Sequence, residues 1–98
     1  MKQYELTIIF DERLSEREIG KIENSVILEH GSILDREDDG VKRLAYPIRD
    51  QDRGHYVFYR LALEDFKPAE LSGELCRTDG ALRHLLVRSD TNFIKERR

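Results

Sequence analysis

Alternating hydrophobic and polar side chains mark a first strand near the start of the chain. Between residues 4 and 10 every second position is aromatic or aliphatic, and the polar side chains of Glu5 and Thr7 lie between them. A period of two is typical of a strand with one buried face. We therefore predict a strand over residues 4–10, and its buried face carries Tyr4, Leu6, Ile8 and Phe10.

The next segment carries the signals that begin and end a helix. Ser15 is followed three residues later by Glu18. This is the spacing of a capping box, in which each side chain binds the backbone N–H of the other residue. Isoleucine and valine then recur every three or four residues, and Gly31 is a residue type that commonly ends a helix in the left-handed conformation. We expect a helix over residues 16–30.

The centre of the chain predicts one long, interrupted strand at an edge of the sheet. Residues 32–36 are weakly strand-like, and Asp39 with Gly40 has the composition of a bulge or turn before the segment 41–48. Pro47 has no N–H to donate to a neighbouring strand, and two cationic side chains in the same segment discourage further pairing. Both features are typical of an edge strand.

The third strand is the most hydrophobic part of the chain. After a polar hairpin loop expected over residues 49–54, the segment 55–63 is almost uninterrupted in β-branched, aromatic and aliphatic residues. This composition is typical of a central strand covered on both faces. Pro68 then suits the first position of a second helix, which we expect to end near Arg77, and residues 81–89 predict a last strand.

These elements follow one another in the order β-α-β-β-α-β, which is a split βαβ unit repeated. The economical arrangement is an α+β, ferredoxin-like fold: a four-stranded antiparallel-type sheet with two helices on one face. We expect the 98 residues to form a single domain. A tail of about residues 90–98 has too little apolar pattern for a further element.

Composition narrows the class of function. Hydrophobic residues make up 39% of the chain and charged residues 38%, which indicates a globular protein with a thin core and little room for a deep catalytic cleft. No apolar stretch approaches the roughly 20 residues that span a bilayer, and no signal-peptide pattern opens the sequence, so we expect a cytosolic protein. Cys76 is the single cysteine, which excludes an intrachain disulfide.

The net charge of −3 argues against RNA binding if the chain is taken as a whole. The two signs are segregated, however, with acids crowded into residues 11–23 and 35–39. The bases gather elsewhere, at Lys42, Arg43, Arg49, Arg53, Arg83, Arg88 and residues 95–98. A basic footprint on an acidic protein is therefore compatible with the sequence.

Enzymatic and metal sites find little support in the sequence. His30, His55 and His84 fall on separate predicted elements, with no spacing suited to a metal. The acidic cluster 37–39 lacks the alternating ligands and the closing glutamate of a calcium loop. The sequence contains neither a Gly-rich phosphate loop nor a Gly-x-Ser-x-Gly elbow. We predict no enzyme activity, no metal site and no cofactor.

One segment resembles a known family. Residues 41–48, which follow a glycine and precede a hairpin leading to Gly54 and Tyr56, resemble the signature of the bacterial small-subunit ribosomal protein six family. Residues 79–88 are similar to the helix-to-strand corner of that family, and the resemblance covers about residues 2–88. It implies a ferredoxin-like fold with the strand order four, one, three, two, and it implies no cofactor.

The resemblance also implies a function. Members bind the central domain of small-subunit rRNA as a heterodimer with ribosomal protein eighteen, on the cytoplasmic ribosome. Arginine can fork onto a phosphate or stack on a base, and tyrosine offers a π-face. Strands one and four are neighbours in the family order, so four residues can converge on the RNA: Lys2, Tyr4, Arg83 and Arg88. Taken singly, each is an ordinary surface group, and only the resemblance favours RNA.

The predicted surface for the partner protein combines the edge strand with one face of the third strand. An apolar sheet face without a third layer is an exposed patch that needs a partner. Its predicted residues are Lys42, Arg43, Tyr46, Tyr56, Phe58 and Arg60. Two aromatics beside an arginine could also stack on RNA bases, and we prefer the protein contact. Arg83 and Arg88, five residues apart, point to opposite faces if the last strand is regular.

The fold alone does not decide the function. Ferredoxin-like domains also include acylphosphatases and metabolite-sensing regulatory domains. A small-molecule-binding regulatory module is therefore the alternative hypothesis to a ribosomal protein.

Overall fold

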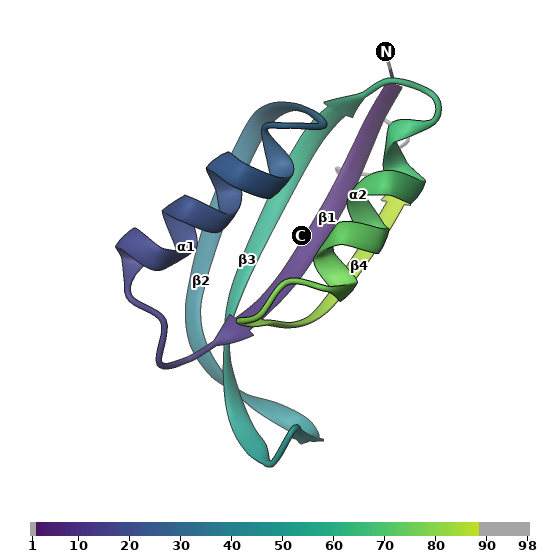
Figure 1. Ribbon diagram of the computed structural model, residues 1–98. Coiled ribbons are helices and arrows are strands. Elements are labelled where there is room, and N and C mark those ends of the chain that lie inside the picture. Colours follow the sequence, from purple (N-terminus) through teal and green to yellow (C-terminus); the bar gives the residue numbers. More distant parts are fainter. Residues whose placement is uncertain (1, 89–98) are drawn as a thin grey trace.

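The computed structural model describes residues 2–88, and the predicted tail lies outside them. The elements are β1 (Lys2–Asp11), α1 (Glu16–Ile22), the π-helical η1 (Glu23–Ile27), β2 (Gly31–Ile48), β3 (Gln51–Leu63), α2 (Lys67–Cys76) and β4 (Ala81–Arg88). They form one four-stranded sheet in the order β2-β3-β1-β4, with every neighbouring pair antiparallel. Both helices lie on one face of this sheet (Figure 1). The predicted fold class and strand order are confirmed.

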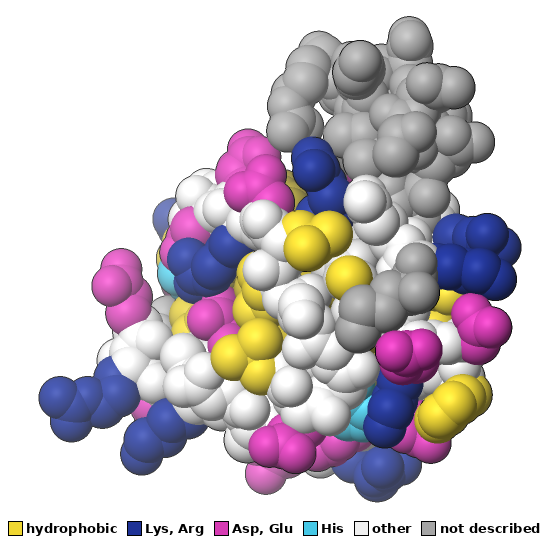
Figure 2. Space-filling model, turned by 90° about the horizontal axis from the view of Figure 1, so that it is seen from above, with side chains coloured by type: hydrophobic (Ala, Val, Ile, Leu, Met, Phe, Trp, Pro, Cys, Tyr) yellow, Lys and Arg dark blue, Asp and Glu magenta, His cyan; other side chains and the backbone are white. Residues whose placement is uncertain are grey.

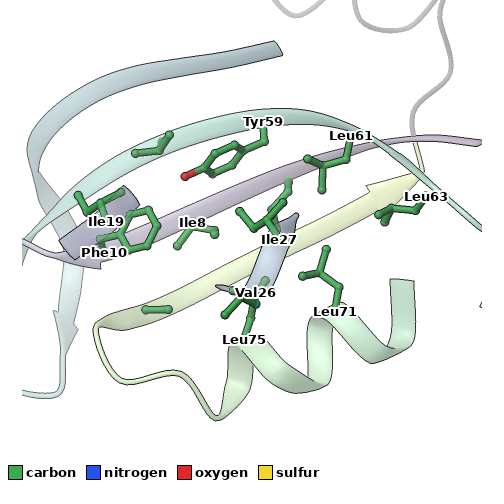
Figure 3. Packing of buried hydrophobic residues seen from close by; sticks show 13 residues of the cluster. Ile8, Phe10, Ile19, Val26, Ile27, Tyr59, Leu61, Leu63, Leu71 and Leu75 are labelled. Carbon is green, nitrogen blue, oxygen red and sulfur yellow. The ribbon is translucent and has the colours of Figure 1, made fainter. Parts of the chain in front are cut away.

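The hydrophobic core lies between the sheet and the helices (Figure 3). The sheet contributes the predicted buried face of β1, where Leu6, Ile8 and Phe10 are at most 1% exposed, together with alternate residues of β3. The helical side contributes Ile19, Val26, Ile27, Leu71 and Leu75. Burial of large aliphatic side chains in this layer is the main favourable contribution to folding.

The third strand occupies the interior position that was predicted, between β2 and β1. The expectation that both its faces are covered is wrong for this chain. Val57 and Tyr59 are buried beneath the helices, whereas Tyr56 and Phe58 between them are only partly buried. The physical reason is that both helices pack on the same side, so the other face has no second layer within residues 2–88.

The first helix begins as predicted and ends differently. Ser15 Oγ accepts a hydrogen bond from the Glu18 N–H at 3.2 Å, and Glu18 Oε1 accepts one from the Ser15 N–H at 2.8 Å, which confirms the capping box. After Ile22 the backbone widens into η1, where the Leu28 N–H donates to the Glu23 carbonyl at 3.0 Å. The wider turn buries the consecutive residues 26 and 27 against the sheet.

Gly31 does not end the helix in the left-handed conformation, so that prediction is wrong. Positive φ angles among the described glycines occur at Gly40 and Gly80 instead. Gly31 begins β2, and a Cβ there would lie 2.3 Å from the carbonyl oxygen of Ala62 on β3. The position needs glycine because the two backbones approach closely, not because of its dihedral angles.

The long second strand lies at the sheet edge, as predicted. Its register against β3 changes between Asp38 and Gly40, which confirms the predicted bulge. The expected loop over residues 49–54 is wrong. Arg49 and Asp50 form a two-residue turn with φ angles of 51° and 66°, and β3 already begins at Gln51. Two positive φ angles match the right-handed twist of the flanking strands, and Ile48 pairs with Gln51 directly beside the turn. The register then shifts before Arg43 pairs with Arg53.

Candidate binding surface

The sheet face opposite the helices, which we call the open face, presents side chains in three aligned rows. In one row Arg60 of β3, Glu5 of β1 and Val87 of β4 lie opposite one another. The next rows are Phe58, Thr7 and Leu85, and then Tyr56, Ile9 and Arg83. On β2 these rows continue with Asp35, Glu37 and Gly40. The open face is therefore acidic toward β2 and apolar or basic toward β4.

The β4 side of the open face exposes large aliphatic side chains. Leu85 is 62% exposed and Val87 is 42% exposed, although both lie on a regular strand. Large aliphatics that lie together in water are typical of a protein contact surface. These two residues were not predicted, although the consecutive apolar residues 85–87 place apolar side chains on both faces of a strand and carried the signal. The surface seen from above differs from this part of the open face: small hydrophobic areas there lie among charged side chains of both signs (Figure 2).

The β2 side of the open face holds an open depression of about 230 Å³. Carboxylates of Glu5, Asp35 and Glu37 line it, together with Arg60 and Phe58. Its volume is below the roughly 300–1,000 Å³ of sites that enclose a small ligand. Its geometry therefore gives no support to the small-molecule alternative.

Three of the four predicted RNA-contacting residues lie at one end of β1 and β4. Tyr4 and Arg88 are directly opposite each other, and Lys2 lies two residues along β1. Lys2 Nζ is 3.4 Å from Asp65 Oδ1, so part of its charge is compensated. Tyr4 is partly buried against the core, with its side chain on the helix-covered face.

Arg83 is separate from the other three, so the predicted convergence of all four residues is wrong. It lies opposite Ile9, five residues from Arg88, a separation of roughly 16 Å along a strand. Because five is an odd number, the two arginines also point to opposite faces, as predicted. Arg83 belongs to the open face.

The structure instead brings Arg83 to a residue that was predicted to bind the partner protein. Its Nη1 donates a hydrogen bond to the Tyr46 hydroxyl at 2.8 Å, and its Cζ lies 5.5 Å from the centroid of the Tyr46 ring. Tyr46 is 57% exposed. The two residues are 37 positions apart in the sequence. Their proximity was not predicted because residues 49–54 were expected to form a loop, whereas the two strands of the hairpin extend to Ile48 and from Gln51.

This contact forms because the end of the β2–β3 hairpin packs against the open face. Leu44 is only 7% exposed, although it lies outside the main core. A Cβ on Gly54 would lie 2.4 Å from Ile9 Cγ2 and 3.4 Å from Leu44 Cδ2. The absent side chain of Gly54 thus leaves a space that Ile9 and Leu44 both border. Tyr46 lies two residues beyond Leu44 along the same strand.

The remaining predicted partner residues differ in how their charges are compensated. Lys42 Nζ is 2.9 Å from Asp39 Oδ2 and 5.5 Å from the centroid of the Tyr56 ring. Arg43 is exposed and lies opposite Arg53 in the hairpin, a like-charge pairing that a sheet does not favour. Arg60 on the open face lies between two acidic positions of the neighbouring strands.

Sequence reasoning did not single out a polar network under the helices. Glu23 Oε2 accepts hydrogen bonds from the Tyr59 hydroxyl at 2.5 Å and from Arg36 Nε at 2.7 Å. Burial of Tyr59, and next its bond to the carboxylate, raise the pKa of the phenol. These three residues connect η1 with β2 and β3, and no local pattern links positions so far apart.

The histidines have separate surroundings, as their sequence positions suggested. Burial lowers the pKa of His84, and its Nε2 lies 2.7 Å from Ser72 Oγ. His30 and His55 contact Glu74 and Asp38, respectively. Within residues 2–88 no group of three or more His, Cys, Asp or Glu side chains could hold a metal ion. No helix in the same part of the chain is long and apolar enough to cross a membrane.

Comparison with known proteins identifies the family. The family model described as Ribosomal protein S6 matches residues 3–88. The Small ribosomal subunit protein bS6 of Desulforudis audaxviator is 35% identical over 94 residues, which is 92% of this chain and 100% of that protein. The Thermus thermophilus protein of the same name is 26% identical, over 96% of this chain and 97% of its own.

The solved structure of 30S ribosomal protein S6 from Thermotoga maritima has the same fold. It matches with a TM-score of 0.74 at 23% identity and covers 98% of this chain and 94% of its own. An uncharacterized protein from the same organism matches with a TM-score of 0.58 at 24% identity, over 91% of this chain and 98% of its own. The two solved structures show that the fold is shared, and the sequence matches show common descent. This chain belongs to the ribosomal protein S6 family.

Proposed function

We propose that this chain binds the central domain of small-subunit rRNA as a heterodimer with ribosomal protein eighteen. Its family consists of structural proteins of the small ribosomal subunit and is not known to be enzymatic, and the ribosome is cytoplasmic.

The open face is the observation that carries the protein contact. The helices cover only the other side of the sheet, so Leu85 and Val87 stay exposed beside the partly buried Phe58 and Ile9. Covering these side chains removes apolar surface from water, which favours association. We assign Leu85 and Val87 to the partner surface, with the six predicted residues of the hairpin and β3.

Uncompensated arginines support the RNA contact. Among residues 2–88, neither Arg83 nor Arg88 forms an ion pair with a carboxylate, whereas Lys2 and Lys42 do. A guanidinium without an acidic partner can donate to phosphate oxygens without first breaking a bond. The chain as a whole carries a net charge of −3, so two or three such contacts give weak RNA binding on their own. We expect the partner protein to supply most of the remaining affinity.

A titration of a fluorescent central-domain rRNA fragment tests the proposal. The fragment is titrated with this chain, with ribosomal protein eighteen, and with the two proteins together. We expect weak binding by the chain alone and much tighter binding by the pair. Equal affinity with and without the partner would contradict the heterodimer. Binding of a free metabolite without any RNA binding would instead favour the small-molecule alternative.

A matched pair of variants tests the open face itself. Leu85→Ser removes an exposed leucine from the open face, and Leu28→Ser removes one that is 46% exposed after η1. Both substitutions should leave folding nearly unchanged because neither side chain is in the core. We expect the first to weaken binding of ribosomal protein eighteen, measured by isothermal titration calorimetry, and the second to leave it unchanged. Equal effects of the two variants would remove Leu85 from the interface.

A further inference from the structure

We infer that Tyr46 is a positioning residue for RNA binding: it holds the Arg83 guanidinium at the hairpin end of the open face, beyond Leu85 and Val87, ready to donate to a phosphate group of the RNA backbone. The inference rests on the proposed RNA contact of Arg83 and deepens it. It assigns to the end of the β2–β3 hairpin a role in RNA binding, besides the role in protein binding predicted for Tyr46.

The geometry of the pair leaves most of the guanidinium available. One N–H group of Nη1 donates to the Tyr46 hydroxyl at 2.8 Å, and a guanidinium has five such groups. Tyr46 is neutral, so the contact orients Arg83 without cancelling its charge. Among residues 2–88 no carboxylate forms an ion pair with Arg83. An oriented, uncompensated guanidinium is well suited to bidentate contact with a phosphate.

The chain next to Tyr46 is anchored by a buried side chain. Tyr46 lies two residues from the buried Leu44, whose side chain lies beside Gly54 on the open face. A long arginine side chain loses rotamer freedom when it binds a ligand, and holding it in place beforehand lowers that cost. The hairpin contact therefore acts on RNA affinity through Arg83, even if Tyr46 itself never touches RNA.

A hydroxyl on the helical side of the molecule provides a matched control. The exposed Ser25 hydroxyl of η1 donates to the Lys21 carbonyl at 2.8 Å. Neither residue belongs to the predicted RNA or partner surfaces, and the helices lie on the face of the sheet opposite the open face. Ser25→Ala therefore removes one exposed side-chain hydrogen bond, as Tyr46→Phe does, and should leave the Arg83 contact with RNA unchanged.

The experiment measures rRNA affinity at several salt concentrations, with this chain held in complex with ribosomal protein eighteen. Arg83→Ala should lower the salt slope by about one unit because one phosphate contact is lost. Tyr46→Phe keeps the ring and removes the hydrogen bond, so it should weaken RNA binding roughly 2- to 10-fold while the slope stays the same. Ser25→Ala should change neither quantity.

A double-mutant cycle then separates positioning from direct contact. If Tyr46 acts through Arg83, Tyr46→Phe should have no further effect in the Arg83→Ala background. Additive losses would overturn the inference, because they would mean that the Tyr46 hydroxyl contacts RNA itself. Unchanged affinity of Tyr46→Phe beside a weakened Arg83→Ala would also overturn it.

Two further measurements keep the outcomes distinct. Affinity for ribosomal protein eighteen is measured separately for each variant, and a loss for Tyr46→Phe that is confined to this affinity would overturn the positioning role. If the unaltered pair of proteins does not bind the rRNA fragment, the proposed function itself fails and the inference fails with it. Tyr46→Phe retains the ring, so its folding, checked by thermal unfolding, should match that of the unaltered chain.

Discussion

Replacing Gly54 by alanine should destabilise the protein and loosen the end of the hairpin. The new Cβ would lie 2.4 Å from Ile9 Cγ2, which is far inside van der Waals contact. Ile9 is β-branched and belongs to the interior strand β1, so its methyl group has little freedom to turn away. Leu44 Cδ2, at 3.4 Å, limits movement in a second direction. Either the hairpin or β1 must therefore shift.

The size of the effect follows from two opposing terms. Overpacking costs about 1–3 kcal/mol, and the reduced freedom of the unfolded chain returns about 0.4–1 kcal/mol, so we expect a net loss of about 0.5–2 kcal/mol. For a domain of this size each kcal/mol corresponds to roughly 4–8 °C in Tm. Gly20→Ala is the matched control, because nothing lies within 4 Å of the Cβ position there and the residue is inside α1. It should stabilise the protein by about 0.5–1 kcal/mol.

Urea unfolding of the three proteins gives the two free-energy differences, and their opposite signs are the test. Hydrogen exchange adds a local readout: amides of residues 43–53 should exchange faster in Gly54→Ala, while those of β1 near Leu6 should change only with global stability. If Gly54→Ala proved as stable as the unaltered chain, with unchanged exchange in the hairpin, then the space beside Gly54 would not be what holds the hairpin end against the open face and Tyr46 beside Arg83.

Three further predictions concern other parts of the molecule. Tyr59→Phe removes the hydrogen bond to the Glu23 carboxylate and should lower the free energy of unfolding by about 1.5–3 kcal/mol in urea titrations; a change below about 0.5 kcal/mol would mean that the bond contributes little. The hydrogen bonds from Arg13, the side-chain one above all, hold the pKa of Asp11 far below its usual range, so this group stabilises the fold above its unfolded pKa of about 4, and the contribution is lost as pH falls toward the folded pKa. Asp11→Asn should therefore show a shallower loss of stability on acidification, and an identical pH profile would argue against this linkage. Arg43→Glu should weaken binding of ribosomal protein eighteen more than it weakens folding, and unchanged partner affinity in a folded variant would count against its place in the interface.

The sequence alone determined the elements whose signals are local. Alternation in β1, the capping box at Ser15 and the missing N–H of Pro47 each act within a few residues, and each predicted its element correctly. The strand order followed from which strand is most apolar and which bears features of an edge, together with the family resemblance. These signals are reliable because the spacing of apolar side chains along a strand or a helix indicates which of its faces is buried.

Only the tertiary structure decided the features that depend on two distant segments. The close approach of Gly31 to Ala62 and the space beside Gly54 depend on segments that are distant in the sequence. A glycine in a sequence does not indicate which other residue will lie close to it. The separation of Arg83 from Lys2 and Tyr4 needed the register of β4 against β1. The contact of Tyr46 with Arg83 needed both a two-residue turn and a hairpin packed on the open face. Sequence patterns report which side of an element is buried, whereas the site depends on which elements meet, and that is set by packing across the whole sheet.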